Sequence, residues 1–169
     1  MSGRLGIAVI GRNEGERLRR CLDSVADRGV LSVYVDSGST DGSVELARSK
    51  GVDVVELDLD TPFTMGRGRN TAFRRLMELE REFSFVQFVD GDCEVAEGWL
   101  ELTRRALEEH EDTGVVCGRR SEREPERSIY NRLTDMEGRH QAGEVQFAGG
   151  DVMLRVEAFR DASGATTRR

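Results

Sequence analysis

Two carboxylates that flank a glycine, Asp90-Gly91-Asp92, are the residues of this sequence best suited to metal chemistry. Hard cations such as Mg²⁺ and Mn²⁺ take oxygen ligands, and two carboxylates one residue apart at a turn can direct oxygens to one ion. The glycine permits a tight turn and leaves room for a phosphate group. A nearly unbroken apolar run, Phe83 to Val89, precedes the pair. The pattern therefore predicts a site for a divalent ion and a diphosphate.

A second pair with the same spacing, Asp58-Leu59-Asp60, is less informative. Leu57 and Leu59 alternate with these two aspartates, which is the pattern of a strand with one polar face. We therefore expect Asp58 and Asp60 to be solvated, and the spacing of two acids alone does not identify the metal site.

Short apolar runs alternate with helical patterns along the first half of the chain. Strands are predicted at Leu5–Ile10, Leu31–Val35, Val52–Leu57 and Phe83–Val89. Helices are predicted after Asn13, which with Glu16 forms a capping box, and at Ser43–Ser49, Thr71–Glu82 and Ala96–His110. Shorter elements are predicted at Val115–Cys117, Ile129–Met136, Val145–Ala148 and Val152–Leu154. This order predicts an α/β fold with a mostly parallel sheet.

Polar residues follow three of the predicted strands: Gly11 to Gly15, Asp36 to Gly42, and Asp90 to Asp92. Ligands of parallel α/β sheets bind beyond the carboxyl ends of the strands, so we expect these segments to meet at one edge. Two roles remain open for two of the acids. Glu14 suits either a ligand contact or a favourable position near a helix N-terminus, and Asp36 suits either a ligand contact or an Asx turn.

Arg67, Arg69 and Asn70 stand in a glycine-bearing stretch, 61–70, that we expect to be a loop. The planar fork of arginine donates two parallel hydrogen bonds and suits a diphosphate, whereas arginines on a helix surface are the alternative. The charged stretch Arg119–Arg127 has no apolar periodicity, so we expect a solvated loop there.

Composition and missing motifs exclude several classes of protein. The 169 residues fit one domain, and the net charge of −7 argues against nucleic acid as a partner. Neither a G-x-G-x-x-G turn after the first strand nor a G-x-x-x-x-G-K-[ST] loop occurs. The three cysteines have no metal-ligand spacing, and no apolar run reaches about 18 residues. We expect a soluble cytoplasmic protein, with peripheral association with a membrane left open.

Four segments together resemble the family 2 glycosyltransferases. They are Ile7 to Glu14, Val35 to Gly42, Arg67 to Asn70 and Val89 to Asp92, in the order and spacing of that family. Gly149-Gly150-Asp151, followed by Val152 to Phe159, resembles the acceptor-side strand and helix of the family. The resemblance implies a GT-A fold, a Rossmann-like three-layer sandwich, in a single domain over residues 1–169. Residues 1–93 would form the nucleotide-binding half, and residues 94–169 part of the acceptor half.

The resemblance also implies roles for individual residues. Glu14 would contact the ribose and Asp36 the base, while Arg69 and Asn70 would line the nucleotide pocket with Arg12 and Gly91 beside it. Arg67 would lie near the diphosphate. Asp90 would meet the ribose or a metal-bound water, and Asp92 would bind the Mn²⁺ or Mg²⁺ that bridges the diphosphate. The implied reaction moves a sugar, with inversion, from a nucleotide sugar (UDP-sugar by family habit) to a carbohydrate or lipid-linked acceptor, as in polysaccharide biosynthesis.

The sequence departs from the family pattern in two places. Ser37 stands where many members have a second acid, and no Glu-Asp pair follows Gly150, where the family's general base is found. Asp151 is the remaining candidate base, and we expect a family member cut short at its C-terminus. Two alternatives therefore stay open: a nucleotide-sugar-binding module without a base, and a nucleotidyltransferase, which would carry a glycine-rich basic loop after its first strand.

Overall fold

The computed structural model describes residues 3–26, 29–80, 82–137, 143–144 and 150–166. Its elements in chain order are β1 (Arg4–Gly11), α1 (Glu16–Ser24), β2 (Leu31–Asp36), α2 (Ser43–Ser49), β3 (Asp53–Glu56), α3 (Met65–Leu79), β4 (Phe83–Asp90), α4 (Trp99–Glu109), β5 (Val115–Cys117), the 3₁₀ helix η1 (Pro125–Arg127), α5 (Ile129–Glu137), β6 (Val152–Arg155) and α6 (Val156–Thr166). The predicted strand Val145–Ala148 lies outside the described residues.

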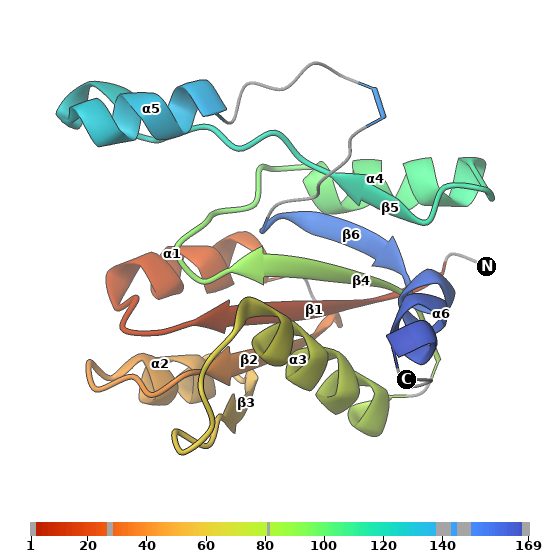
Figure 1. Ribbon diagram of the computed structural model, residues 1–169, viewed down its shortest axis with the longest axis horizontal. Coiled ribbons are helices and arrows are strands. Elements are labelled where there is room, and N and C mark those ends of the chain that lie inside the picture. Colours follow the sequence, from red (N-terminus) through yellow and green to blue (C-terminus); the bar gives the residue numbers. More distant parts are fainter. Residues whose placement is uncertain (1–2, 27–28, 81, 138–142, 145–149, 167–169) are drawn as a thin grey trace.

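One sheet of six strands, in the order β3-β2-β1-β4-β6-β5, forms the centre of the molecule (Figure 1). β1 pairs in parallel with β2 and β4, and β2 pairs in parallel with β3. β6 runs antiparallel to both of its neighbours, β4 and β5. The predicted α/β class with a mostly parallel sheet is therefore confirmed.

Helices cover both faces of the sheet and make it a three-layer structure. On one face α3 and α6 pack against alternate residues of β1, β2 and β4, with Phe73, Leu76 and Val156 in that core. On the other face α1 and α2 bury Leu18, Leu22 and Ala47 against the intervening residues of the same strands, and α4 covers Phe85 and Met153 with Leu107. Because both faces are covered, the central strands are largely apolar, with Gln87 of β4 as a buried polar exception.

Three strands end at the same level. Gly11 pairs with Asp36 across β1 and β2, and Ile10 pairs with Asp90 across β1 and β4. The backbone continues this alignment past the strand ends, because Gly91 N donates to Ile10 O at 2.7 Å and Ser37 N donates to Gly11 O at 3.2 Å. The expected meeting of three polar segments at one edge of the sheet is therefore confirmed.

Candidate functional site

Asp90 and Asp92 lie at the centre of this edge, at the turn that ends β4. Gly91 between them is buried, and a Cβ on it would lie 3.1 Å from Ile10 O. A side chain there would push the turn away from β1, so a glycine keeps the two acids at the edge of the sheet. The Asp90 side chain is 19% exposed, whereas Asp92 is an exposed residue.

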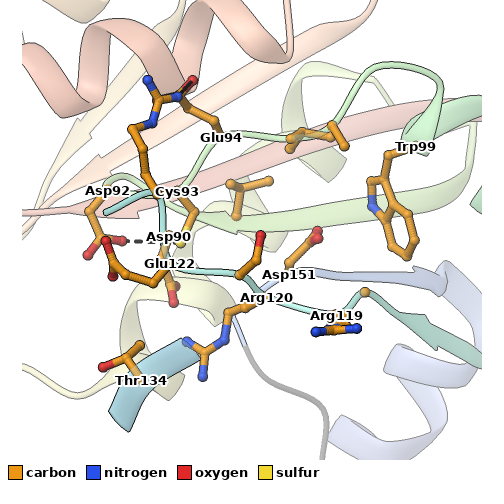
Figure 2. Close-up of a pocket in the computed structure, with 16 residues that line it drawn as sticks. Asp90, Asp92, Cys93, Glu94, Trp99, Arg119, Arg120, Glu122, Thr134 and Asp151 are labelled. Atoms are coloured by element: carbon orange, nitrogen blue, oxygen red, sulfur yellow. Dashed lines mark hydrogen bonds and ion pairs between the residues drawn. The ribbon is translucent and has the colours of Figure 1, made fainter. Parts of the chain in front are cut away.

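Two cavities meet at this pair of carboxylates. The β1-side cavity, about 250 Å³, is lined by residues 10–12, 14, 37, 63, 65 and 90–92. The β6-side cavity, about 520 Å³, is lined by residues 89, 90, 92–96, 99, 118–123, 134 and 151 (Figure 2). Asp90 and Asp92 line both. An ion held by these carboxylates would therefore touch ligands in either cavity.

The electrostatics of Asp90 favour a bound cation. Burial raises the pKa of its carboxyl, and the charge of Asp92 raises it further, while Arg69, with NH2 3.3 Å from Oδ1, lowers it. The backbone of Gly150 packs directly against the same carboxylate, because a Cβ on Gly150 would lie 1.8 Å from Asp90 Oδ2. Only a glycine fits at position 150 with Asp90 in this position. Its predecessor in the expected motif, Gly149, lies outside the described residues.

Glu14 lies in the β1-side cavity with its carboxylate largely covered. Arg17 NH2 lies 2.7 Å from Oε2 as an ion pair, but the two groups are not in hydrogen-bond geometry, and buried Oε2 accepts no hydrogen bond. Burial raises the pKa of this carboxyl, Arg17 lowers it, and Asp92 raises it. A buried acceptor without a donor at a cavity wall is suited to a ligand hydroxyl.

Asp36, by contrast, uses its carboxylate inside the protein. It is 1% exposed, and it accepts hydrogen bonds from the Tyr34 hydroxyl at 2.9 Å and from the backbone of Gly38 and Ser39 at 2.8 and 2.7 Å, as well as from the Ser39 hydroxyl. The Asx-turn alternative fits this geometry. Asp36 does not line the β1-side cavity, and its neighbour Ser37 does. That Asp36 contacts a base stays a prediction, and the wall of the β1-side cavity next to it is formed by Ser37.

Arg67, Arg69 and Asn70 stand on a helix, so the predicted loop over 61–70 is confirmed for residues 61–64 and wrong for residues 65–70. Helix α3 begins at Met65, because the Thr64 side chain caps it by accepting a hydrogen bond from Arg67 N at 3.0 Å. The glycines that indicated a loop are tolerated within the first turn. Gly68 is buried, and a Cβ there would lie 3.3 Å from Ile10, so the helix approaches β1 closely.

The helical placement separates the three side chains. Arg69 reaches Asp90, as described above. Arg67 donates to Thr61 O at 2.7 Å and Asp58 O at 2.9 Å, so its guanidinium holds the preceding loop. Asn70 is exposed and lines neither of the two cavities. That Asn70 lines the nucleotide pocket stays a prediction.

Two further expectations about the loops are wrong. Asn13 does not cap α1, which has Gly15 at its N-cap position without a side-chain hydrogen bond. Asn13 has φ 55° and links two loops instead, accepting from Thr40 N at 2.7 Å while its own N donates to Ser39 Oγ at 2.8 Å. Asp58 and Asp60 lie in a turn beyond the end of β3 rather than on a strand, and Asp60 N donates to Asp58 Oδ1 at 2.9 Å.

Asp151 lies in the wall of the β6-side cavity, just before β6. Gln87 Nε2, inside the sheet, donates to its Oδ1. Burial raises the pKa of the Asp151 carboxyl, and the Gln87 bond lowers it. Gly118 packs on the other oxygen, because a Cβ there would lie 2.7 Å from Asp151 Oδ2. A carboxylate held in place with a raised pKa can act as a general base.

The structure adds residues that the sequence patterns did not indicate. Phe63 and Met65 line the β1-side cavity, and Trp99, Arg119 and Arg120 line the β6-side cavity. The Trp99 indole N–H is buried without a hydrogen-bond acceptor among the described residues. The expected solvated loop at Arg119–Arg127 is confirmed for residues 119–123, which are irregular and mostly exposed, and these residues also line the β6-side cavity. No periodicity marks such residues, because their role depends on tertiary contacts.

Arg12 is an exposed residue at the mouth of the β1-side cavity, directly after β1. It also lines an adjoining cavity of about 240 Å³ formed with the loop at residues 57–62. A guanidinium in this position can reach an anionic ligand that enters from solvent.

Comparisons with known proteins fit this geometry. The model of Glycosyl transferase family 2 matches residues 7–168. Glycosyltransferase AglE of Haloferax volcanii is 31% identical over 111 residues, which are 61% of this chain and 34% of that protein. Glycosyltransferase AglJ of the same organism is 35% identical over 81 residues, which are 47% of this chain and 24% of that protein. The matched part thus spans a quarter to a third of these relatives.

Two solved structures share the fold. Mannosyltransferase PcManGT from Pyrobaculum calidifontis, in complex with GDP-Man and Mn²⁺, has a TM-score of 0.66 at 22% identity, over 97% of this chain and 47% of that chain. Glucosyl-3-phosphoglycerate synthase from Mycobacterium tuberculosis, in complex with Mn²⁺, UDP-glucose and phosphoglyceric acid, has a TM-score of 0.61 at 22% identity, over 92% of this chain and 57% of that chain. The expected GT-A fold class is confirmed by these similarities.

Proposed function

Because the chain belongs to glycosyl transferase family 2, we propose that it carries the donor site of a metal-dependent glycosyltransferase, which moves a sugar from a nucleotide sugar to an acceptor hydroxyl. The observation that carries this proposal is that Asp90 and Asp92 line two cavities at once. The β1-side cavity would take the nucleoside diphosphate, and the β6-side cavity would take the acceptor. The sugar would lie at their junction.

The donor atoms at the junction fit Mn²⁺ or Mg²⁺. Among the described residues, no three His, Cys, Asp or Glu side chains converge as a metal site, and the proposed protein ligands are the two carboxylates of Asp90 and Asp92. Mg²⁺ is commonly bound in this way, by one or two carboxylates with substrate phosphates and water completing the shell. When bound, the ion stabilises the negative charge that develops on the departing diphosphate. The structural neighbours that contain Mn²⁺ together with a nucleotide sugar support this choice.

Residues of the β1-side cavity would bind the nucleotide. Glu14 Oε2, which is ion-paired with Arg17 but accepts no hydrogen bond, would meet a ribose hydroxyl. Phe63 offers an apolar surface to a base beside Ser37. Arg69 would steady Asp90, and Arg12 at the mouth would meet a phosphate. The neighbours include complexes with GDP-Man and with UDP-glucose, which supports a nucleotide sugar as donor. UDP remains the nucleotide that we expect.

The transfer balances without a further reactant. The acceptor oxygen attacks the anomeric carbon from the face opposite the diphosphate, the bond from that carbon to the diphosphate breaks, and the configuration inverts. The nucleoside diphosphate leaves with the bonding electron pair. The Asp151 carboxylate takes the acceptor proton, and its raised pKa makes it a stronger base than an exposed aspartate.

In this proposal, the two halves of the chain form different cavities. Residues 1–93 supply the β1-side cavity and residues 94–169 most of the β6-side cavity, in one domain. The chain spans less than two thirds of the length of the relatives and solved structures it matches, and we propose the acceptor side from this structure alone. In the described part of the chain, no helix is long and apolar enough to cross a membrane.

Calorimetric titration of UDP, GDP and dTDP, each with and without Mn²⁺, tests the donor site first. We expect one nucleotide to bind with at least tenfold higher affinity when Mn²⁺ is present. Incubation with the matching nucleotide sugar and candidate acceptors then tests transfer, with mass spectrometry of the products. Asp151→Asn should keep nucleotide binding and lose transfer.

Three results would contradict the proposal in different ways. A folded protein that binds no nucleotide with Mn²⁺ would remove the donor site altogether. Nucleotide-sugar binding without transfer to any acceptor would leave a binding module. Release of pyrophosphate from a nucleoside triphosphate in the presence of a sugar phosphate would identify a nucleotidyltransferase instead.

A further inference from the structure

The β6-side cavity contains charges that the proposed donor site does not use. Three arginines line it, Arg119, Arg120 and Arg123, together with five acids: Asp90, Asp92, Glu94, Glu122 and Asp151 (Figure 2). The cavity wall thus has more acidic than basic groups. Which of these groups can bind a ligand depends on which already have partners within the protein.

Most of these acids already have partners. Glu94 forms ion pairs with Arg20 at 2.9 Å and with Arg123, so Arg123 is occupied as well. Glu122 Oε1 accepts from Glu124 N at 3.3 Å. Asp90 pairs with Arg69, and Asp151 accepts from Gln87. Asp92 accepts from Cys93 Sγ at 3.4 Å. Arg119 and Arg120 form no hydrogen bond or ion pair with any residue that the structure describes, so two cationic groups are left over.

The backbone fixes the place of these two arginines. They follow Gly118, whose N donates to Asp151 O at 3.2 Å. A Cβ at Gly118 would lie 2.7 Å from Asp151 Oδ2 and 3.0 Å from the Trp99 ring, so the segment is packed against the floor of the cavity. Arg120 is also near enough to lower the pKa of Asp151 against the effect of burial. Arg119 and Arg120 are both exposed, but an arginine on a free loop would have neither of these restraints.

We propose that the acceptor carries a phosphate group, which Arg119 and Arg120 bind in the β6-side cavity. This inference rests on the proposed function, because it names the class of acceptor for that same site. Guanidinium forks match phosphate oxygens with paired hydrogen bonds, and a bound phosphate would neutralise the two free cations. It would also hold the acceptor hydroxyl on the side of the cavity where Asp151 lies.

A phosphate of this kind has two sources, a soluble phosphate ester or the head group of a lipid. Helix α5 lies beside the cavity, since its Thr134 lines it. The helix projects from the body of the molecule (Figure 1), and its apolar residues Ile129, Tyr130, Leu133 and Met136 are 79, 78, 52 and 61% exposed. A lipid would need this face, whereas a soluble ester would not.

The test compares three proteins: the unchanged chain, Arg119→Gln/Arg120→Gln, and a control of equal charge, Arg48→Gln/Arg105→Gln, whose arginines pair with Glu56 and Glu109 on other surfaces. Each is saturated with Mn²⁺ and the nucleotide that it binds. Glycerol 3-phosphate is then titrated by calorimetry, and flotation with phosphatidic acid or phosphatidylcholine vesicles is measured in parallel.

We expect the unchanged chain and the control to bind glycerol 3-phosphate or phosphatidic acid vesicles, and the Arg119/Arg120 variant to bind at least tenfold more weakly. Its nucleotide affinity should stay within twofold. Binding to phosphatidic acid vesicles that is lost in the variant Leu133→Ser identifies a lipid phosphate. Binding of glycerol 3-phosphate without binding to vesicles identifies a soluble ester.

The opposite outcomes overturn the proposal and differ from failure of the donor site. If the unchanged chain binds the nucleotide with Mn²⁺ but binds no phosphate probe, the phosphate acceptor alone is refuted. Equal binding of the phosphate probe by all three proteins refutes it as well. A loss of nucleotide affinity in the Arg119/Arg120 variant would assign these arginines to the donor diphosphate. Absence of nucleotide binding by the unchanged chain would instead refute the proposed function.

Discussion

Replacing Gly150 by alanine should disable the metal site without unfolding the protein. A Cβ at this position would lie 1.8 Å from Asp90 Oδ2, whereas real Cβ contacts are essentially never closer than 3.0 Å. The difference, 1.2 Å, is the least distance by which the carboxylate or the Gly150 backbone must move. The obstructing atoms lie at the end of the Asp90 side chain, which can move without moving the backbone. We therefore expect the free energy of unfolding to fall by less than about 1 kcal/mol.

The effect on binding should be much larger. Metal–oxygen distances in protein sites vary by only about 0.2 Å, so a shift of 1.2 Å removes Asp90 from the geometry a divalent ion needs. Disturbing a group that orients a metal ligand typically costs about 10–100-fold in affinity, or about 1.4–2.8 kcal/mol. We expect a loss of this size in the Mn²⁺-dependent affinity for the nucleotide.

Calorimetry with Mn²⁺ and the nucleotide, together with thermal unfolding, measures both quantities. Gly66→Ala is the matched control, because a Cβ there meets no atom within 4 Å and Gly66 lies in the first turn of α3. That variant should bind the nucleotide normally and be as stable as the unchanged chain or up to about 1 kcal/mol more stable. A folded Gly150→Ala protein whose affinity stays within twofold would show that Asp90 does not need its observed position.

Three further predictions test separate parts of the reasoning. Asp92→Ala should abolish the Mn²⁺ dependence of nucleotide binding and leave the melting temperature unchanged, because Asp92 is exposed; a retained metal effect would refute its role as ligand. Asp36→Ala should destabilise the protein by about 2–4 kcal/mol in urea unfolding, because buried donors lose their acceptor, and a loss under 1 kcal/mol would contradict this. The hydrogen bond from Arg75 lowers the pKa of Asp53 below its ordinary 3.8. The contribution of this pair to the stability of the fold is therefore complete above pH 3.8 and is lost as the pH falls through the folded-state pKa of Asp53. Asp53→Asn should therefore flatten the acid side of the stability profile, and an unchanged profile would show that the pair contributes nothing.

Much of the architecture could be predicted from local patterns. The strands at the centre of the sheet are apolar because helices cover both faces, and the predicted strands agree with β1, β2 and β4 to within a residue or so. The helix Ser43–Ser49 agrees with α2 in both bounds. The meeting of polar segments at one edge followed from the parallel order of the strands. These features depend on the periodicity of apolar residues and on the rules by which consecutive strands and helices are connected, and both can be read from the sequence.

Local patterns failed where one side chain or one capping group decided between two structures. Two glycines in the stretch 61–70 indicated a loop, but the Thr64 cap and the packing of Gly68 against Ile10 start α3 at Met65. Asn13 resembled a helix cap, but its side chain holds a neighbouring loop. In each case the competing conformation gained tertiary hydrogen bonds or contacts that local propensity does not contain.

By itself the sequence determined the α/β class, the order of strands and helices, the family, and the place of Asp90 and Asp92 at the end of an apolar strand. Only the tertiary structure decided that Gly150 packs on Asp90 and that Asp36 is hydrogen-bonded within its own loop while Ser37 lines the β1-side cavity. It also decided that Arg119 and Arg120 line the β6-side cavity together with Asp151. The physical reason is distance along the chain. Periodicity reports which face of an element is buried, but contacts between residues about 30 to 60 positions apart depend on how packed elements align, and a shift of about 1 Å changes which side chain a cavity receives.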